Sequence, residues 1–326
     1  MSKPDIIWWS IDSVRRDRCS SYGYSRPTTP NFSEVGTQLI GRSHGTWTLP
    51  SVTSILTLQD AKEHGVMEQG DQLSLKSETV PARLQSAGYQ TIGLAANPWV
   101  SRGSGLNIGF EEFYNIDEDG SLLKAVGWKR ALQFVARIRQ RGGGFTTDPL
   151  YHPTDWLMIA LARQRLKRSP DSNPSFLYLH TKGCHSVNQD FHPPPSWVGK
   201  ISTGETRSDR YDDLLSWVDS LWPWFEPAIP DDAIVIVTSD HGELLGEDGL
   251  FGHDHDHPLL HEVPLWIRGI DCDWSDGDTS HIDVMRCLLS KIDVSTDACD
   301  IETVSMNSGK RVSDEMEEKL SALGYR

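Results

Sequence analysis

The most constraining feature of this chain is an alternation of short apolar runs with helix-like stretches along most of its length. Short, almost continuous apolar runs are typical of strands covered on both faces, as in α/β sheets. Strands that alternate with helices favour a layered α/β sheet. The apolar runs cover residues 5–12, 90–96, 176–180, 233–239 and 264–268, and the clearest helices cover 51–58, 80–87 and 211–221.

The length of 326 residues is sufficient for one large α/β domain. We expect a single domain over residues 1–326, with a small C-terminal segment at about 270–326. No apolar run approaches the roughly 18 residues of a membrane span, so we expect no stable membrane insertion. Residues 1–5 lead directly into the first strand, so we expect no signal peptide.

The cysteine pattern favours a reducing compartment. The five cysteines are odd in number and follow no metal-binding spacing. This argues against a disulfide scaffold or a zinc ribbon and favours the cytoplasm as the location. The sequence does not indicate an oligomeric state.

The formal net charge is −15, from 31 basic and 46 acidic residues. Aspartate outnumbers glutamate by 30 to 16, and lysine is scarce at 11 against 20 arginines. Self-repulsion on this scale favours solubility, and high salt would screen it. The composition fits a protein of a salt-loving organism and, equally, an ordinary acidic cytosolic enzyme.

One stretch, residues 121–168, has the opposite charge. It holds ten basic and two acidic residues, a formal charge of 10 − 2 = +8. We expect a basic helical insertion there, with helices over 122–139 and 154–167 and a break at 142–144. Either the helices are amphipathic and their basic faces pair with acidic surface elsewhere, or they form a cationic lid. A lid would draw in a polyanionic substrate such as a phosphorylated glycan, a lipid head group or a nucleic acid.

Polar residues follow several of the predicted strands: Asp12, Asn97, His180, and Asp240 with His241. In open α/β sheets, ligands collect at the carboxyl ends of the strands. Aspartate and neutral histidine supply oxygen and nitrogen ligands to divalent ions, so Asp240 and His241 are candidate metal ligands. Asp12 has an alternative interpretation as a helix cap.

Thr48 stands two residues before Pro50, which is favourable near a helix start. One interpretation makes Thr48 or Ser51 the N-cap of this helix. The other places the Thr48 hydroxyl at a helix N-terminus, where the backbone N–H groups favour an anion. A hydroxyl there becomes a nucleophile if a metal lowers its pKa.

A histidine-rich segment, with His253, His255 and His257 at alternate positions, lies downstream of Asp240. It reads either as a metal-binding patch of its own or as a solvated loop. For His255 and His257 the loop is the simpler interpretation.

Taken together and in order, these segments resemble the sulfatase branch of the alkaline phosphatase superfamily. They are similar to the family's first strand with its metal-binding aspartate, the nucleophile motif, and the late metal and substrate motifs. The resemblance implies an alkaline-phosphatase-like three-layer α/β/α sandwich around a mostly parallel central sheet. The residues that carry it are 5–17, 22–31, 48–51, 239–243, 246–247, 251–253, 263–265 and 316–325.

The resemblance also implies residue roles and one divalent metal ion, Ca²⁺, Mg²⁺, Mn²⁺ or Zn²⁺. Relatives with two metals have a carboxylate just before His185, which this chain lacks; a second metal with help from His253 and His255 stays an alternative. The implied metal ligands are Asp12, Thr48, Asp240 and His241. The implied catalytic residues are Thr48, His185 and His253, and the implied substrate contacts are Asn97, His185 and His253.

Three departures from the family pattern concern the chemistry. Thr48 stands where sulfatases have the cysteine or serine that becomes formylglycine, Val52 replaces the usual arginine, and Ser13 replaces a second aspartate. Threonine nucleophiles in this superfamily go with phosphate esters. We therefore expect cleavage or transfer of an anionic phosphate ester through a covalent phospho-threonine on Thr48. The alternatives are a sulfuric ester hydrolase without formylglycine and a catalytically silent binding relative.

Overall fold

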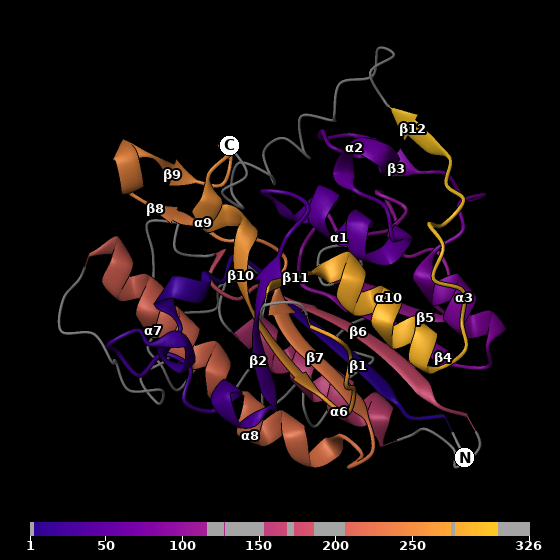
Figure 1. Cartoon of the computed structure of the whole chain (residues 1–326), viewed down its shortest axis with the longest axis horizontal. Helices are drawn as coiled ribbons and strands as arrows, with labels where there is room; N and C mark the ends of the chain where they lie inside the picture. Colours follow the sequence, from indigo (N-terminus) through magenta and orange to yellow (C-terminus); the bar gives the residue numbers. More distant parts are fainter. Residues whose placement is uncertain are drawn as a thin grey trace.

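The structure, a computed structural model, describes residues 3–115, 127, 153–167, 173–185, 206–274 and 278–305. Its centre is an eight-stranded sheet (Figure 1). Along the sheet the strands are β11 (Asp278–Ser280), β2 (Thr37–Arg42), β10 (Glu262–Arg268), β7 (Ile234–Ser239), β1 (Ile6–Ile11), β6 (Ser175–Thr181), β4 (Gln90–Ala95) and β5 (Glu112–Asn115). Neighbouring strands are parallel except around β10, which runs antiparallel to both β7 and β2.

The five predicted strands are all present as β1, β4, β6, β7 and β10. They are almost continuously buried because the sheet is covered on both faces. In β1, Trp9 packs into one hydrophobic core and Trp8 into the other. Successive side chains of a strand point to opposite faces, so an uninterrupted apolar run serves two cores at once.

Helices cover both faces of the sheet, which confirms the predicted three-layer α/β/α arrangement (Figure 1). Residues of one set of helices pack in the core that contains Trp9, and residues of the other set pack in the core that contains Trp8. The first set is α6 (Pro153–Leu166), α7 (Arg207–Asp219) and α8 (Trp222–Phe225); the second is α1 (Thr48–Thr57), α3 (Val80–Ser86) and α10 (His281–Lys291).

Short elements complete the described part of the chain. Two small antiparallel pairs lie outside the main sheet, β3 (Asp71–Leu73) with β12 (Thr303–Ser305) and β8 (Leu244–Leu245) with β9 (Phe251–Gly252). The remaining helices are α2 (Ala61–His64) and α9 (Pro258–His261), with 3-10 turns at Arg16–Arg18, Ser20–Tyr22, Phe32–Glu34, Glu226–Ala228 and Glu247–Gly249.

Helix α6 is the part of the predicted basic insertion that the structure describes. It is a buried covering helix rather than an amphipathic one, since every residue from Trp156 to Ala162 is buried. Arg165 Nε lies 2.6 Å from Glu112 Oε2, so this basic residue pairs within the fold. Helix α6 is therefore no cationic lid. The predicted helix over 122–139 and the break at 142–144 lie outside the described residues.

The predicted C-terminal segment is joined to the main body. Strand β11 belongs to the central sheet, α10 covers that sheet, and β12 pairs with β3. Residues 316–325, which resemble the family's ending, lie outside the described residues.

Two expectations from composition can be compared with the structure. No helix in the described ranges is long and apolar enough to cross a membrane. All five cysteines lie in these ranges; Cys272 and Cys287 form one disulfide, and the other three are free and buried. One disulfide between a short loop and α10 does not amount to a disulfide scaffold.

Candidate active site

The polar residues that follow the predicted strands do converge. Asp12 directly follows β1, His180 lies near the end of β6, and Asp240 with His241 directly follows β7. These strands are parallel neighbours, so their carboxyl ends share one edge of the sheet. All four side chains are completely buried. Asp12 caps no helix, because its carboxylate accepts hydrogen bonds from site residues instead.

Two carboxylates and two imidazoles form the centre of the site. The ligand atoms of Asp12, His180 and Asp240 all lie within 4.8 Å of one another. His180 Nε2 is 3.0 Å from Asp240 Oδ2, and His241 Nε2 is 3.4 Å from Asp12 Oδ1. His241 Nδ1 lies 2.7 Å from the carbonyl oxygen of Gly242 and donates to it. That hydrogen bond leaves the lone pair on Nε2, the atom that faces the carboxylates, so Nε2 is the candidate ligand atom of His241.

The electrostatics of this cluster fit a divalent cation. Burial raises the pKa of Asp12, and the charge of Asp240 raises it further. Burial opposes ionisation of Asp240 too, but His241 and His180 hold the pKa of Asp240 below its ordinary value. Two carboxylates this deeply buried need positive charge beside them, and the donor set of oxygen and imidazole nitrogen suits such an ion. His180 was not predicted as a ligand; its place at a strand end was the only sequence signal.

Thr48 lies at the N-terminus of α1, as the nucleophile interpretation requires. Helix α1 begins at Thr48, three residues earlier than predicted, and its N-cap is Trp47 with no side-chain capping bond. Of the two interpretations, the one that makes Thr48 or Ser51 the N-cap is therefore wrong. The Thr48 hydroxyl is buried and lies 3.3 Å from His241 Nε2 instead.

Asn97 lies beside the nucleophile position. Its Nδ2 donates to Thr48 Oγ1 at 3.0 Å and to Asp12 Oδ2 at 2.7 Å. The backbone N–H of Trp99 donates to Asn97 Oδ1 at 2.8 Å, which fixes the orientation of the amide. Asn97, predicted as a substrate contact, thus orients the threonine hydroxyl and a carboxylate in this structure.

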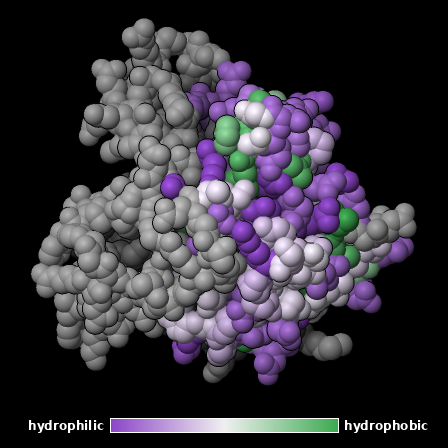
Figure 2. Space-filling model, turned by 90° about the vertical axis from the view of Figure 1, so that its left-hand side faces the viewer, coloured by the Kyte–Doolittle hydropathy of each residue, from purple (hydrophilic) through white to green (hydrophobic). Residues whose placement is uncertain are grey.

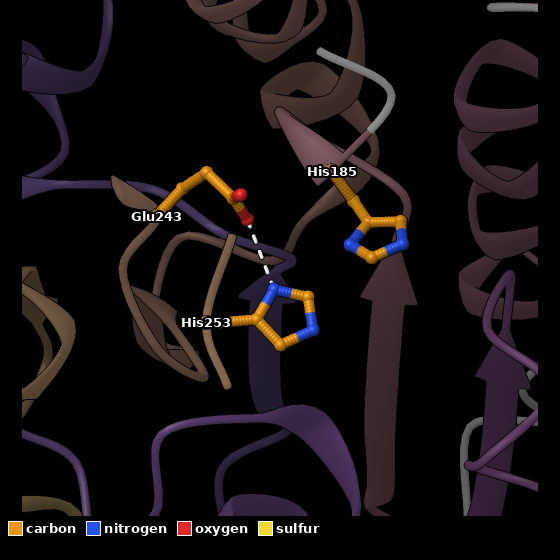
Figure 3. Close-up of side chains that lie close together, drawn as sticks. All are labelled: His185, Glu243 and His253. Atoms are coloured by element: carbon orange, nitrogen blue, oxygen red, sulfur yellow. Dashed lines mark hydrogen bonds and ion pairs between the residues drawn. The ribbon is translucent and has the colours of Figure 1, made fainter. Parts of the chain in front are cut away.

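A second group lies next to the first: His185, Glu243 and His253 point toward one another from the segments that follow β6, β7 and β9 (Figure 3). His253 Nδ1 is 3.0 Å from Glu243 Oε2. Burial alone would lower the pKa of His253, but the Glu243 carboxylate raises it to about 9. Burial lowers the pKa of His185 well below its ordinary range, and the charge of His253 adds to the effect. His253 is thus protonated and His185 neutral at neutral pH.

Ser13 connects the two groups. Its hydroxyl lies 2.9 Å from Asp12 Oδ1 and 3.3 Å from Glu243 Oε2, and the backbone has a left-handed φ of 63°. A strained backbone at such a position is typical of functional sites. Glu243 lies in the segment 239–243 that resembles the family's late metal motif, but no role was predicted for it from the sequence. An acidic residue three positions after Asp240 was the available signal.

The other two histidines of the histidine-rich segment join neither group in the described structure. His255 is exposed, and His257 Nδ1 accepts from the backbone N–H of Leu259 at 3.1 Å, which caps α9. This supports the loop interpretation. His255 gives no help to a second metal here.

Comparisons with known proteins agree with this fold. The sulfotransferase Agl7 of low-salt glycan biosynthesis, from Haloferax volcanii, is 22% identical over 298 residues, covering 77% of this chain and 67% of the relative. A phosphonate monoester hydrolase of Agrobacterium radiobacter has the same fold with a TM-score of 0.71, at 17% identity, covering 90% of this chain and 74% of that one. The C-terminal periplasmic domain of the phosphoethanolamine transferase EptC from Campylobacter jejuni gives a TM-score of 0.61 at 15% identity, covering 91% and 92%.

The family assignment rests on a match over nearly the whole chain. The family model described as Sulfatase matches residues 4–294, a range that includes every residue of both side-chain groups. With its alkaline-phosphatase-like sheet and the assembled groups at the sheet edge, this chain belongs to the Sulfatase family of enzymes that act on ester bonds.

Proposed function

We propose that this protein is a metal-dependent enzyme that cleaves or transfers a phosphate ester through a covalent intermediate on Thr48. The observation that carries the proposal is the position of the Thr48 hydroxyl. It lies at the N-terminus of α1, 3.3 Å from His241 Nε2 and beside the acidic group formed by Asp12 and Asp240. A helix N-terminus favours the anionic group of an ester, and the hydroxyl stands where attack on it would occur.

The cation would be held by Asp12, His180, Asp240 and His241, with Thr48 completing the set. When bound, it would lower the pKa of the Thr48 hydroxyl and offset charge on the anionic ester group. The two imidazoles favour Zn²⁺ or Mn²⁺ over Ca²⁺ and Mg²⁺. Asn97 orients the threonine hydroxyl through its amide N–H, and the backbone N–H groups of α1 receive the anion.

His253, from the second group, acts as the acid on the leaving alcohol. In the first step the Thr48 oxygen, whose proton has passed to solvent, forms a bond to phosphorus, the bond from phosphorus to the alcohol oxygen breaks, and His253 donates a proton to that oxygen. Its raised pKa keeps it protonated for this purpose. In the second step water or an acceptor alcohol gives its proton to His253 and attacks the phosphorus, and the bond from phosphorus to the Thr48 oxygen breaks, which gives hydrolysis or transfer and restores the protonated His253.

One metal is the better fit to this scheme. A second ion held by His185, Glu243 and His253 is the alternative, but it would take the place of the proton on His253. The phosphonate monoester hydrolase and phosphoethanolamine transferase among the structural relatives support phosphorus chemistry by analogy.

Sulfate ester chemistry is the second candidate, because the similar curated protein is a sulfotransferase. The same threonine and the same leaving-group acid serve a sulfate ester in principle. If sulfate esters are the substrates, an aryl phosphate is turned over more slowly than the matching aryl sulfate. The following experiment compares the two rates.

The test compares aryl phosphate, aryl phosphodiester and aryl sulfate as substrates after chelation and after addition of single divalent metals. We expect turnover of a phosphate ester only with metal, and loss of turnover in Thr48→Ala. Mass spectrometry of acid-quenched wild type should show a phosphate adduct on the peptide that contains Thr48. Thr53→Ala is the matched control, since the Thr53 hydroxyl lies on the same helix and, among the described residues, donates to the carbonyl of Leu49 alone. Turnover by Thr48→Ala at the wild-type rate would contradict the proposal.

A further inference from the structure

The β8–β9 hairpin stands directly beside the second group of the site. Glu243 immediately precedes β8, and His253 immediately follows β9. Between them, Phe251 has an exposed fraction of 52%, although it is a large apolar residue. Figure 2 looks onto the side of the molecule where this hairpin and α7 lie, and the described surface there is mostly hydrophilic. An exposed aromatic ring beside a catalytic group is a candidate substrate contact.

Arg207, the first residue of α7, lies over this ring. Its guanidinium carbon is 4.8 Å from the centroid of Phe251. The acidic group facing it is Glu243, whose Oε1 is 4.0 Å from Arg207 Nη2, the limit of an ion pair. Arg207 Nε is buried and has no hydrogen-bond partner among the described residues. By contrast, Arg15 and Arg18 pair with carboxylates at 2.6 to 2.8 Å.

The charge of Arg207 is not fully balanced by the described acidic residues, so Arg207 can bind an anion. Glu243 is already engaged by His253 at 3.0 Å and by Ser13 at 3.3 Å. Partial burial lowers the pKa of Arg207, and Glu243 only partly compensates. An arginine with an unused N–H and a distant counter-ion is stabilised by a bound carboxylate, phosphate or sulfate group.

The position of Arg207 identifies which part of the substrate it would meet. The reacting group lies at Thr48, next to His241, and His253 follows with its ring centroid 4.8 Å from that of His241. His253 contacts Glu243, and Glu243 in turn lies 4.0 Å from Arg207, so this series of contacts leads from the reacting group through the proposed leaving-group acid to Arg207. An anion at Arg207 is therefore a second one, separate from the ester that reacts.

We propose that Arg207 and Phe251 form a subsite for a second anionic group carried by the alcohol part of the substrate, with the Phe251 ring against an adjoining apolar face. This inference rests on the proposed function, because it takes His253 as the acid on the leaving side. It deepens that function by naming a substrate class, esters of anionic alcohols. Arg207 and Phe251 are specificity-determining residues in this scheme.

The test uses two pairs of compounds that differ only by one carboxylate. The first pair is phenyl phosphate and 3-carboxyphenyl phosphate, compared by kcat/KM. We expect wild type to favour the carboxylated ester by about tenfold, the usual effect of one charge-assisted hydrogen bond. Arg207→Met should bring the ratio close to one, and Arg207→Lys should restore part of it. Arg210→Met is the matched control on the same helix, since Arg210 is exposed, and it should keep the wild-type ratio.

The second pair separates this inference from the proposed function. Phenylphosphonate and 3-carboxyphenylphosphonate are not cleaved as esters, so calorimetry measures their binding to metal-loaded protein whether or not turnover occurs. Tighter binding of the carboxylated compound to wild type, lost in Arg207→Met, supports the subsite even if no phosphate ester is turned over. Equal binding of both compounds to wild type overturns the subsite, even if phosphate esters are cleaved. The subsite is also overturned if Arg207→Met binds both compounds more weakly by the same factor and still prefers the carboxylated compound.

Discussion

Two buried histidines should make this protein sensitive to mild acid. His281 is fully buried below the site, with Nε2 2.9 Å from the Thr238 hydroxyl and its ring edge-on to Trp8. His64 is also buried, and its Nε2 lies 3.0 Å from the Ser54 hydroxyl of α1. Burial lowers the pKa of His281 to about 3 and that of His64 to about 4, from the ordinary value of 6.5.

The sign of the effect follows from proton linkage. Below pH 6.5 the unfolded chain takes up a proton on each histidine while the folded chain does not, so the free energy of unfolding falls as the pH falls. At about pH 5 the pH is about 1.5 units below the pKa of a histidine in the unfolded chain. Each histidine therefore lowers the free energy of unfolding by about 2 kcal/mol, at 1.36 kcal/mol per unit. The two together cost about 4 kcal/mol, a large part of the roughly 5–15 kcal/mol that stabilises a typical domain.

The measurement is urea unfolding, followed by tryptophan fluorescence, at about pH 7.5 and about pH 5 and at constant ionic strength. His281→Gln and His64→Gln should each reduce the loss of unfolding free energy between these pH values by about 2 kcal/mol. The exposed His255→Gln is the control and should leave the loss unchanged. The difference between two pH values is compared, so an overall destabilisation by either variant does not affect the result. A double variant that loses as much as wild type would refute the reasoning.

Two further predictions concern the site. Glu243→Gln removes the carboxylate that raises the pKa of His253 to about 9, so burial should bring that pKa below its ordinary value. The fall of kcat/KM with rising pH should then begin at least two pH units lower than in wild type. An unchanged pH profile would argue against His253 as the acid. Asp240→Asn should lower the affinity for Zn²⁺ or Mn²⁺ at least tenfold in calorimetry, because it removes an anionic ligand. Its circular dichroism spectrum should match that of wild type. Full metal occupancy in this variant would show that Asp240 is not a ligand.

Much of the fold could be predicted because its signal is local. An uninterrupted apolar run such as 233–239 is typical of a strand covered on both faces, and β7 is such a strand. The start of α1 was placed three residues late because a helix without a capping side chain has no local signal at its first residue. For helix α6 the sequence left two alternatives open, basic residues that pair with acidic groups elsewhere or a cationic lid, because the partner of a charge is not a local property. The structure shows that Arg165 pairs with Glu112, a contact between segments far apart in the sequence.

The site residues too were partly indicated by the sequence and partly found only in the structure. Motif order indicated Asp12, Thr48, Asp240 and His241, and the structure assembles all four. Metal dependence, the cytoplasmic location and the salt-loving source stay predictions from the sequence.

The sequence by itself determined the strands, the layered α/β architecture and the residues with chemical potential, because hydrophobic period and residue type are local properties. Only the tertiary structure decided which of these residues meet. His180 approaches Asp240 because β6 and β7 both pair with β1, and Glu243 meets His253 because the β8–β9 hairpin brings its two ends together. Arg207 faces Phe251 because α7 packs beside that hairpin. Such contacts depend on which elements become neighbours, a long-range property that a local pattern does not contain.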